Sequence, residues 1–121
     1  MNTSGILIID NNKGTRESIR MLLEFEGYRV SSCESGSVAF NLVKERCFKV
    51  ILINYRLPEM KGDDVAKLLH PLCSGALVIG FSVEPKEQTF LAAGADAFIS
   101  NNDLPHKLIP LIKNKVESQT F

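Results

Sequence analysis

The sequence predicts an α/β fold in which five β-strands form one parallel sheet and helices cover both of its faces. Three observations lead to this prediction. Short apolar runs without polar alternation recur along the chain, as in strands that are buried on both faces. Segments with apolar residues at helical spacing follow these runs. The 121 residues, 45% of them apolar and 23% charged, suit a single domain spanning residues 1–121 with its core at about 5–117.

The five expected strands differ in how completely they should be buried. Continuous apolar runs at residues 5–9, 50–53 and 76–81 predict three buried strands, and the one at 50–53 is expected at the centre. Residues 28–33 alternate weakly between polar and apolar, which favours a more exposed strand at the edge of the sheet. Residues 95–100 form a short fifth strand in this interpretation.

Helices are expected between the strands, with their limits set by glycine, proline and capping residues. Ser35 or Ser37 is expected to cap the second helix, and Pro110 should bend the last one. The expected helical ranges are about 15–26, a segment ending near 46, 63–70, 85–93, and a final helix from about 103. The side chains expected to face the core from four of these helices are Ile19, Leu22 and Leu23; Val38, Ala39, Leu42 and Val43; Val65, Ala66, Leu68 and Leu69; and Leu108, Leu111, Ile112 and Val116.

Composition and charge narrow the classes of function. The 14 basic and 14 acidic residues balance, which argues against a chain-wide electrostatic grip on nucleic acid or on an anionic membrane. No apolar run approaches the roughly 18 residues of a membrane span, and the first residues lack the features of a signal peptide. The three cysteines are widely spaced without a CxxC pair, which is typical of reduced thiols. We therefore expect a cytoplasmic protein that binds neither nucleic acid nor membrane.

The polar residues that end the predicted strands mark the expected functional edge. In an open parallel sheet, ligands bind in the crevice at the carboxyl ends of the strands. Asp10 and Asn11 follow the first strand, and Asn54 follows the central one. Ser82 and Asn101 end the fourth and fifth strands. The side chain at Asn54 then decides which chemistry this edge supports.

These residues and their spacing resemble the receiver domain of bacterial two-component response regulators, over most of the chain. The resemblance rests on the strand that ends at Asp10, on the pattern N-x-x-x-P-x-M-x-G from Asn54 to Gly62, on the strand that ends at Ser82, and on the segment GADAF at 94–98. It implies a flavodoxin-like (βα)5 three-layer sandwich. It also implies a role in phosphorelay signal transduction.

Several residues depart from the pattern of that family. In the family an aspartate at the position of Asn54 accepts a phosphoryl group from a histidine kinase. Two acidic residues, here Asp10 and Asn11, help to hold Mg²⁺. A hydroxyl, here Ser82, meets the phosphoryl group. A lysine followed by a proline pairs with the phosphate, and here Asn101 and Asn102 stand in those two places.

The substitutions remove the chemistry of phosphorylation. An amide nitrogen is a poor nucleophile because its lone pair is delocalised into the carbonyl, so Asn54 cannot form an acyl phosphate. Mg²⁺ requires hard, anionic oxygens, and only Asp10 remains as a weak or absent metal position. We therefore expect a degenerate pseudo-receiver that is not an enzyme and needs no cofactor, with Mg²⁺ only if the pocket still functions. Asp10, Ser82 and the asparagines are expected to satisfy one another by hydrogen bonding.

The expected role is protein–protein interaction. The resemblance implies a partner such as a histidine kinase, an output domain or another signalling protein, or a second copy of the chain, bound through the fourth helix, fifth strand and fifth helix. Ser82 and Phe98 match the two residues that shift together in the family. Phe98 is equally well interpreted as an interior aromatic residue.

Two other interpretations stay open from the sequence. The chain could be an ordinary phosphorylatable receiver into which Asn54 was introduced at the phosphoacceptor position, or in which Asp10 accepts the phosphate. It could also be a small flavodoxin-like enzyme or nucleotide binder. The enzyme or nucleotide-binder interpretation lacks support, because no glycine-rich loop follows the first strand and no nucleophile has a partnering base.

Overall fold

The computed structural model describes residues 5–116, which form a five-stranded parallel sheet with the order β2-β1-β3-β4-β5. This order, with helices on both faces, is the flavodoxin-like (βα)5 sandwich. It places β3 at the centre and β2 at an edge, and both positions confirm the predictions from the sequence. The strands are β1 (Ile6–Ile9), β2 (Val30–Cys33), β3 (Val50–Asn54), β4 (Leu77–Ser82) and β5 (Ala97–Ser100).

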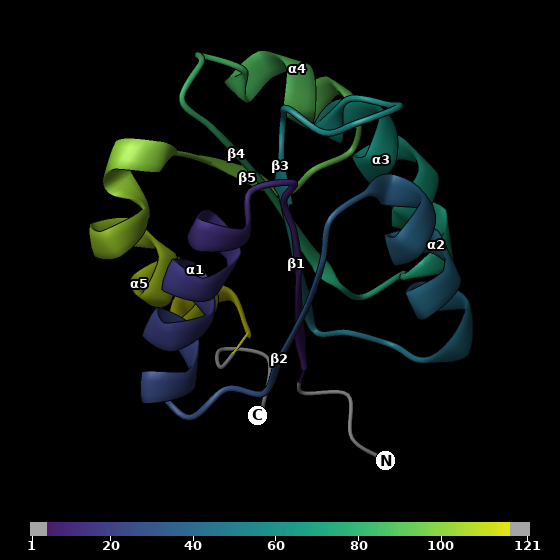
Figure 1. Cartoon of the computed structure of the whole chain (residues 1–121). Coiled ribbons are helices and arrows are strands. Elements are labelled where there is room, and N and C mark those ends of the chain that lie inside the picture. Colours follow the sequence, from purple (N-terminus) through teal and green to yellow (C-terminus); the bar gives the residue numbers. More distant parts are fainter. Residues whose placement is uncertain (1–4, 117–121) are drawn as a thin grey trace.

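Five α-helices within residues 5–116 cover the sheet as two layers (Figure 1). Helices α1 and α5 lie on one face, and α2, α3 and α4 lie on the other. Short 3₁₀ segments, η1 (His70–Leu72) and η2 (Asn101–Asp103), follow α3 and β5. The helices are α1 (Lys13–Phe25), α2 (Gly36–Glu45), α3 (Gly62–Leu69), α4 (Glu87–Ala92) and α5 (Leu104–Val116).

The central strands are buried on both faces, which explains their continuous apolar runs. In β1, Ile6 and Ile8 belong to the core beneath α1 and α5, whereas Leu7 and Ile9 belong to the core beneath α2, α3 and α4. All four are at most 1% exposed. Burial of such side chains contributes roughly 1.5–3 kcal/mol each, so the sheet is held from both sides.

Local hydrogen bonds set two helix starts. The Asn12 side chain accepts a hydrogen bond from the backbone N–H of Thr15 at 2.8 Å, so α1 begins at Lys13, two residues before the predicted start. The Ser35 hydroxyl accepts from the N–H of Val38 at 3.3 Å and caps α2. Of the two predicted caps, Ser35 is therefore the one that is used.

Some sequence-based expectations are wrong at the helix surfaces. Val38 and Leu68 are 41% and 37% exposed, not buried, because the sheet-facing stripes pass through Ala39 and Val43 in α2 and through Val65, Ala66 and Leu69 in α3. Helix α4 begins at Glu87, after a turn in which the Lys86 N–H donates to the Glu84 carbonyl. The side chain of Val116 lies outside the described residues.

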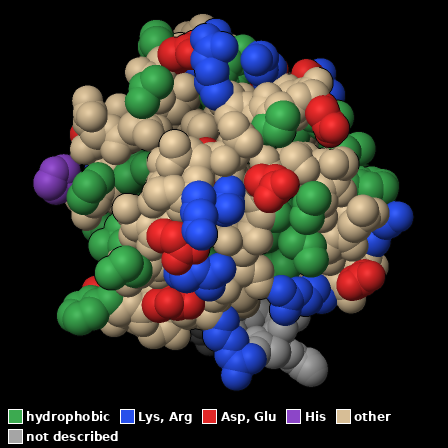
Figure 2. All heavy atoms as spheres, in the orientation of Figure 1, with side chains coloured by type: hydrophobic (Ala, Val, Ile, Leu, Met, Phe, Trp, Pro, Cys, Tyr) green, Lys and Arg blue, Asp and Glu red, His purple; other side chains and the backbone are tan. Residues whose placement is uncertain are grey.

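The described surface carries mixed charge. On the face shown in Figure 2, Lys and Arg side chains alternate with Asp and Glu side chains without a broad area of one sign. None of the helices described between residues 5 and 116 has the length and apolar character that crossing a membrane requires.

Gly80 lets α4 approach the sheet. A Cβ atom at this position in β4 would lie 2.3 Å from Cγ of Phe90, the fully buried aromatic residue of α4. The ring of Phe90 therefore occupies the space that any other side chain at position 80 would need.

Replacing Gly80 by alanine is expected to destabilise the protein by about 1–3 kcal/mol, because the new methyl group overlaps the Phe90 ring. Urea unfolding monitored by circular dichroism measures the change. The double variant Gly80→Ala/Phe90→Leu serves as the control, since the smaller side chain leaves room for the methyl group. If the change in unfolding free energy of the double variant equalled the sum of the changes in Gly80→Ala and Phe90→Leu alone, that result would contradict the contact.

Candidate functional site

Asp10 and Asn54 meet at the carboxyl edge of the sheet. Asp10 directly follows β1, and Asn54 is the last residue of the neighbouring strand β3. The side-chain amide of Asn54 donates a hydrogen bond from Nδ2 to Oδ1 of Asp10 at 3.2 Å. Two residues that are 44 positions apart in the sequence are thus joined side chain to side chain.

Asp10 is a buried carboxylate surrounded by donors. Asp10 is 2% exposed. Its Oδ1 also accepts a hydrogen bond from the backbone N–H of Asn12 at 3.0 Å. Arg16 donates from Nη1 to the backbone carbonyl of Asp10 at 2.8 Å. Burial raises the pKa of Asp10 above its ordinary value of 3.8, and the hydrogen bonds from Asn12 and Asn54 and the charge of Arg16 counteract part of that rise.

The orientation of the Asn54 amide follows from its partners. Nδ2 faces Oδ1 of Asp10 at 3.2 Å and the backbone carbonyl of Arg56 at 3.3 Å. Both of these partners are acceptors, so the NH₂ group and not the carbonyl oxygen must point toward them. The position that a receiver would use for its phosphoacceptor therefore presents a hydrogen-bond donor to Asp10.

These residues do not fit a bound Mg²⁺ ion. Mg²⁺ takes hard oxygen ligands in octahedral geometry. The pocket offers the single carboxylate of Asp10, and Asn54 turns its nitrogen toward that carboxylate. Within residues 5–116, no three His, Cys, Asp or Glu side chains come together in a way that could hold a metal ion.

Ser82 is buried at the end of β4 and is engaged by its own loop. The Ser82 hydroxyl accepts the backbone N–H of Glu84 at 2.9 Å, and the residue is 1% exposed. Glu84 also pairs through Oε2 with Nε of Arg56. The ion pair links the loop after β3 to the loop after β4.

Three aromatic rings connect this pocket to β5. Tyr55 meets Phe90 edge to face with ring centroids 6.3 Å apart, and Phe90 meets Phe98 at 5.8 Å. The ammonium group of Lys86 lies over the Tyr55 ring, 4.6 Å from its centroid. Phe98 is partly buried and packs against the core beneath α2, α3 and α4. Part of its ring remains exposed while it contacts the fully buried ring of Phe90.

The remaining predicted site residues do not join this hydrogen-bond network. Asn11 and Asn102 are exposed. Asn101 is the first residue of η2 and lines a cavity of about 270 Å³ between α1 and α5. Its buried Oδ1 has no hydrogen-bond partner among the described residues. The expected mutual hydrogen bonding is confirmed for Asn54 with Asp10. It is wrong for Asn101, whose buried Oδ1 lacks a partner, and for Ser82, whose hydroxyl bonds to the Glu84 N–H instead. Asn11 is exposed and takes no part in it.

Two contributors to the site were not predicted. Asn12 caps α1 through its side chain and donates its backbone N–H to Asp10, and the spacing of Asn12 to Thr15 is a signal that a capping argument could have used. Glu84 could not be found in this way. Its contacts with Arg56 and Ser82 depend on how two loops meet after folding.

The chain belongs to the response regulator receiver domain family, whose family model matches residues 6–113. It is thus a receiver domain of the two-component signalling class. Receiver domains interact with signalling proteins such as kinases and output domains.

Individual relatives agree with this assignment. Transcriptional regulatory protein SrrA of Staphylococcus aureus (strain NCTC 8325 / PS 47) is 28% identical over 110 residues, which are 89% of this chain and 46% of that protein. The chain therefore spans about half the length of the curated relatives that it matches.

Solved structures match the whole fold. A CheY-like response regulator receiver domain protein from Methanospirillum hungatei JF-1 is 30% identical, with a TM-score of 0.89 over 98% of this chain and 97% of that one. A two-component response regulator from Clostridium difficile has a TM-score of 0.90 at 16% identity, over 98% of this chain and 99% of that one. The second likeness shows the fold alone.

Replacing Asp10 by asparagine is expected to raise the free energy of unfolding at about pH 7, because a neutral amide keeps an acceptor oxygen for Asn12 and Asn54 and removes a buried charge. The pKa of Asp10 is raised in the folded state. The stability that protonated Asp10 contributes is therefore fully present below its ordinary value of 3.8 and is lost as the pH rises through the folded-state pKa. Urea unfolding over a pH series should show an advantage for the variant that shrinks on acidification.

The exposed carboxylate of Asp64, in the first turn of α3, provides a matched control. Asp64→Asn makes the same chemical change without removing a buried charge, and it weakens a favourable contact with the helix dipole. A gain in stability at neutral pH from Asp64→Asn equal to that from Asp10→Asn would contradict the role of burial.

Proposed function

We propose that this receiver domain transmits signals by protein–protein interaction without conventional aspartyl phosphorylation. The observation that carries the proposal is the side chain at position 54, where an amide donates a hydrogen bond to Asp10. The domain is then a pseudo-receiver. It has no catalytic residue and requires no Mg²⁺.

Three separate losses support the proposal. Asn54 has no nucleophilic oxygen that could accept a phosphoryl group, since its carbonyl belongs to a neutral amide. Asp10 alone carries charge where Asp10, Asn11 and Asn54 would supply three carboxylates in a working receiver. Asn101 offers no cation to a phosphate, and charge-assisted pairs of that kind are about twice as strong as neutral ones. One substitution would block phosphorylation, but these substitutions together remove the nucleophile, the metal and the counter-charge.

The contacts around the pocket favour one fixed conformation. The Ser82 hydroxyl bonds to the Glu84 N–H, and Arg56 ties this loop to the loop after β3 through Glu84. Phe98 packs inward on Phe90. Phosphorylation would add roughly 1.5–2 negative charges, and allosteric coupling of this kind is typically about 1–3 kcal/mol. Without that input, a binding partner is the remaining influence on the balance between conformations.

The partner in this proposal is a signalling protein that recognises the surface formed by α4, β5 and α5. A histidine kinase, an output domain or a second copy of the chain would each meet that description. Because binding does not require a phosphate, the complex should form equally well with and without a phosphodonor.

Treatment with acetyl phosphate and Mg²⁺, followed by intact mass measurement, tests the proposal. The wild-type chain is expected to gain no phosphoryl group. Asn54→Asp restores the nucleophile alone and should react slowly, because no counter-charge and only part of the metal site is present. The triple variant Asn11→Asp/Asn54→Asp/Asn101→Lys should react at least about tenfold faster than the single variant, equivalent to ~1.4 kcal/mol in the barrier.

Two outcomes distinguish the alternatives. A labile phosphoryl group on the wild-type chain would overturn the proposal, and its loss in Asp10→Asn would identify Asp10 as the acceptor. Phosphorylation of Asn54→Asp at the rate of the triple variant would instead show that position 54 is the only defect, as in an ordinary receiver carrying an introduced asparagine. Circular dichroism of each variant verifies that it is folded before its rate is compared.

A further inference from the structure

Two cysteines line one cavity at the amino edge of the sheet. Cys47 lies just before β3, and Cys73 lies between η1 and β4. Both border a cavity of about 340 Å³ whose other walls come from the residues next to them in the two loops. The sequence placed these residues 26 positions apart (73 − 47) and gave no sign that they would meet. The edge is the one opposite Asp10 and Asn54.

Backbone hydrogen bonds hold both loops in place. Before Cys47, the Arg46 N–H donates to the Leu42 carbonyl at 3.2 Å, and after it the Lys49 N–H donates to the Gly5 carbonyl at 2.9 Å. The Cys73 N–H donates to the Leu69 carbonyl at 3.0 Å, and the Cys73 carbonyl accepts the Ala76 N–H at 2.9 Å. Each cysteine is thus tethered on both sides. These hydrogen bonds fix the position of both cysteines beside the cavity.

The two thiols differ in exposure. Cys47 is exposed, whereas Cys73 is buried at 6% exposure. Burial first, and the neighbouring Cys47 second, raise the pKa of the Cys73 thiol. An oxidant from solvent would therefore meet Cys47 before Cys73.

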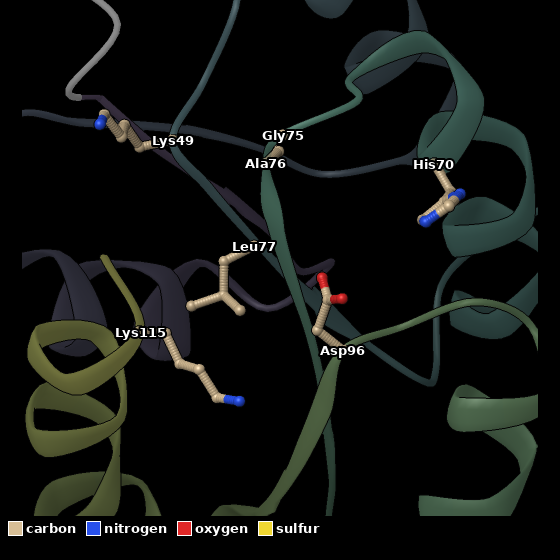
Figure 3. A pocket seen from close by; sticks show the side chains of 7 residues that line it. All are labelled: Lys49, His70, Gly75, Ala76, Leu77, Asp96 and Lys115. Carbon is tan, nitrogen blue, oxygen red and sulfur yellow. The ribbon is translucent and has the colours of Figure 1, made fainter. Parts of the chain in front are cut away.

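A second cavity continues along the same edge and keeps it open. This cavity, of about 330 Å³, shares Lys49, Gly75 and Ala76 with the first and extends toward His70 and Asp96 (Figure 3). The amine of Lys49 lies apart from the carboxylate of Asp96, and Lys115 also lines this cavity (Figure 3). The two cavities together give small molecules a way in to this edge.

From this arrangement we infer that Cys47 and Cys73 are a thiol pair that a peroxide converts into an intrachain disulfide. In the first step the Cys47 sulfur attacks one oxygen of hydrogen peroxide, the O–O bond breaks, and sulfenic acid and water form. In the second step the Cys73 sulfur attacks the Cys47 sulfur, the S–O bond breaks, and a second water leaves as the S–S bond forms. Two thiols are oxidised by two electrons, and one peroxide is reduced to two waters. A thiol or thioredoxin-type reductant reverses the change.

Mass spectrometry of the full chain tests this inference. The reduced protein is exposed to hydrogen peroxide, remaining thiols are alkylated, and peptides are mapped without reduction. The expected product is a monomer that has lost two hydrogen atoms and that yields one cross-linked peptide pair containing Cys47 and Cys73. Its midpoint of thermal unfolding should lie above that of the reduced chain, because the disulfide lowers the conformational entropy of the unfolded state.

Single variants separate the roles of the two sulfurs. Cys73→Ala should accumulate sulfenic acid on Cys47 that reacts with dimedone, and Cys47→Ser should form no intrachain bond. Cys33→Ser is the matched control, because Cys33 is buried beside Ser35, to whose carbonyl its thiol donates, and should leave the cross-link intact. The wild-type peptide map does not depend on any variant folding. Intermolecular dimers alone, irreversible oxidation of Cys47, or a cross-link that includes Cys33 would overturn the inference.

Discussion

The hydrogen bond from the Asn54 amide to the Asp10 carboxylate is the interaction on which the pocket depends. It joins the end of the central strand β3 to the end of its neighbour β1. A carboxylate with a raised pKa is costly to bury, and here backbone and side-chain donors from Asn12 and Asn54 offset part of that cost. With an amide donor at position 54, the Asp10 carboxylate is stabilised by hydrogen bonds from protein groups. An aspartate at that position would place two negative charges in contact, and a metal ion between them would then be needed to offset their repulsion.

The same constraint extends into the neighbouring loop. The hydroxyl of Ser82, at the end of the next strand in the sheet, accepts a hydrogen bond from the Glu84 N–H. The Glu84 side chain pairs with Arg56 from the loop after β3. The Arg56 side chain is 64% exposed, so this ion pair contributes little stability by itself. Its effect is geometric, because it joins the loop after β3 to the loop after β4. The Phe90 ring, in turn, contacts the ring of Phe98 in β5.

How well the sequence predicted each feature depended on whether its cause was local. The buried runs of β1, β3 and β4, the edge position of β2 and the cap at Ser35 follow from periodicity and capping, and each was predicted. The meeting of Asp10 with Asn54 followed from the rule that parallel strands share a carboxyl edge. The orientation of Asn101 did not, because a residue in the first turn after β5 can face either the pocket or α1. The Arg56–Glu84 pair and the shared cavity of Cys47 and Cys73 depend on loop contacts that no local pattern encodes.

Fold and chemistry are separable in this domain for a physical reason. The sheet is stabilised by side chains such as Leu7, Ile8, Leu52 and Ile79, which are fully buried and lie within the strands. The phosphorylation chemistry of a receiver depends on side chains at the strand ends, which contribute little to that burial. Three carboxylates and a lysine in such a pocket repel or pair at a cost in stability that function must justify. Neutral amides remove that cost, and the core beneath them has no reason to change. A receiver fold can therefore keep its buried core when the side chains at the strand ends change.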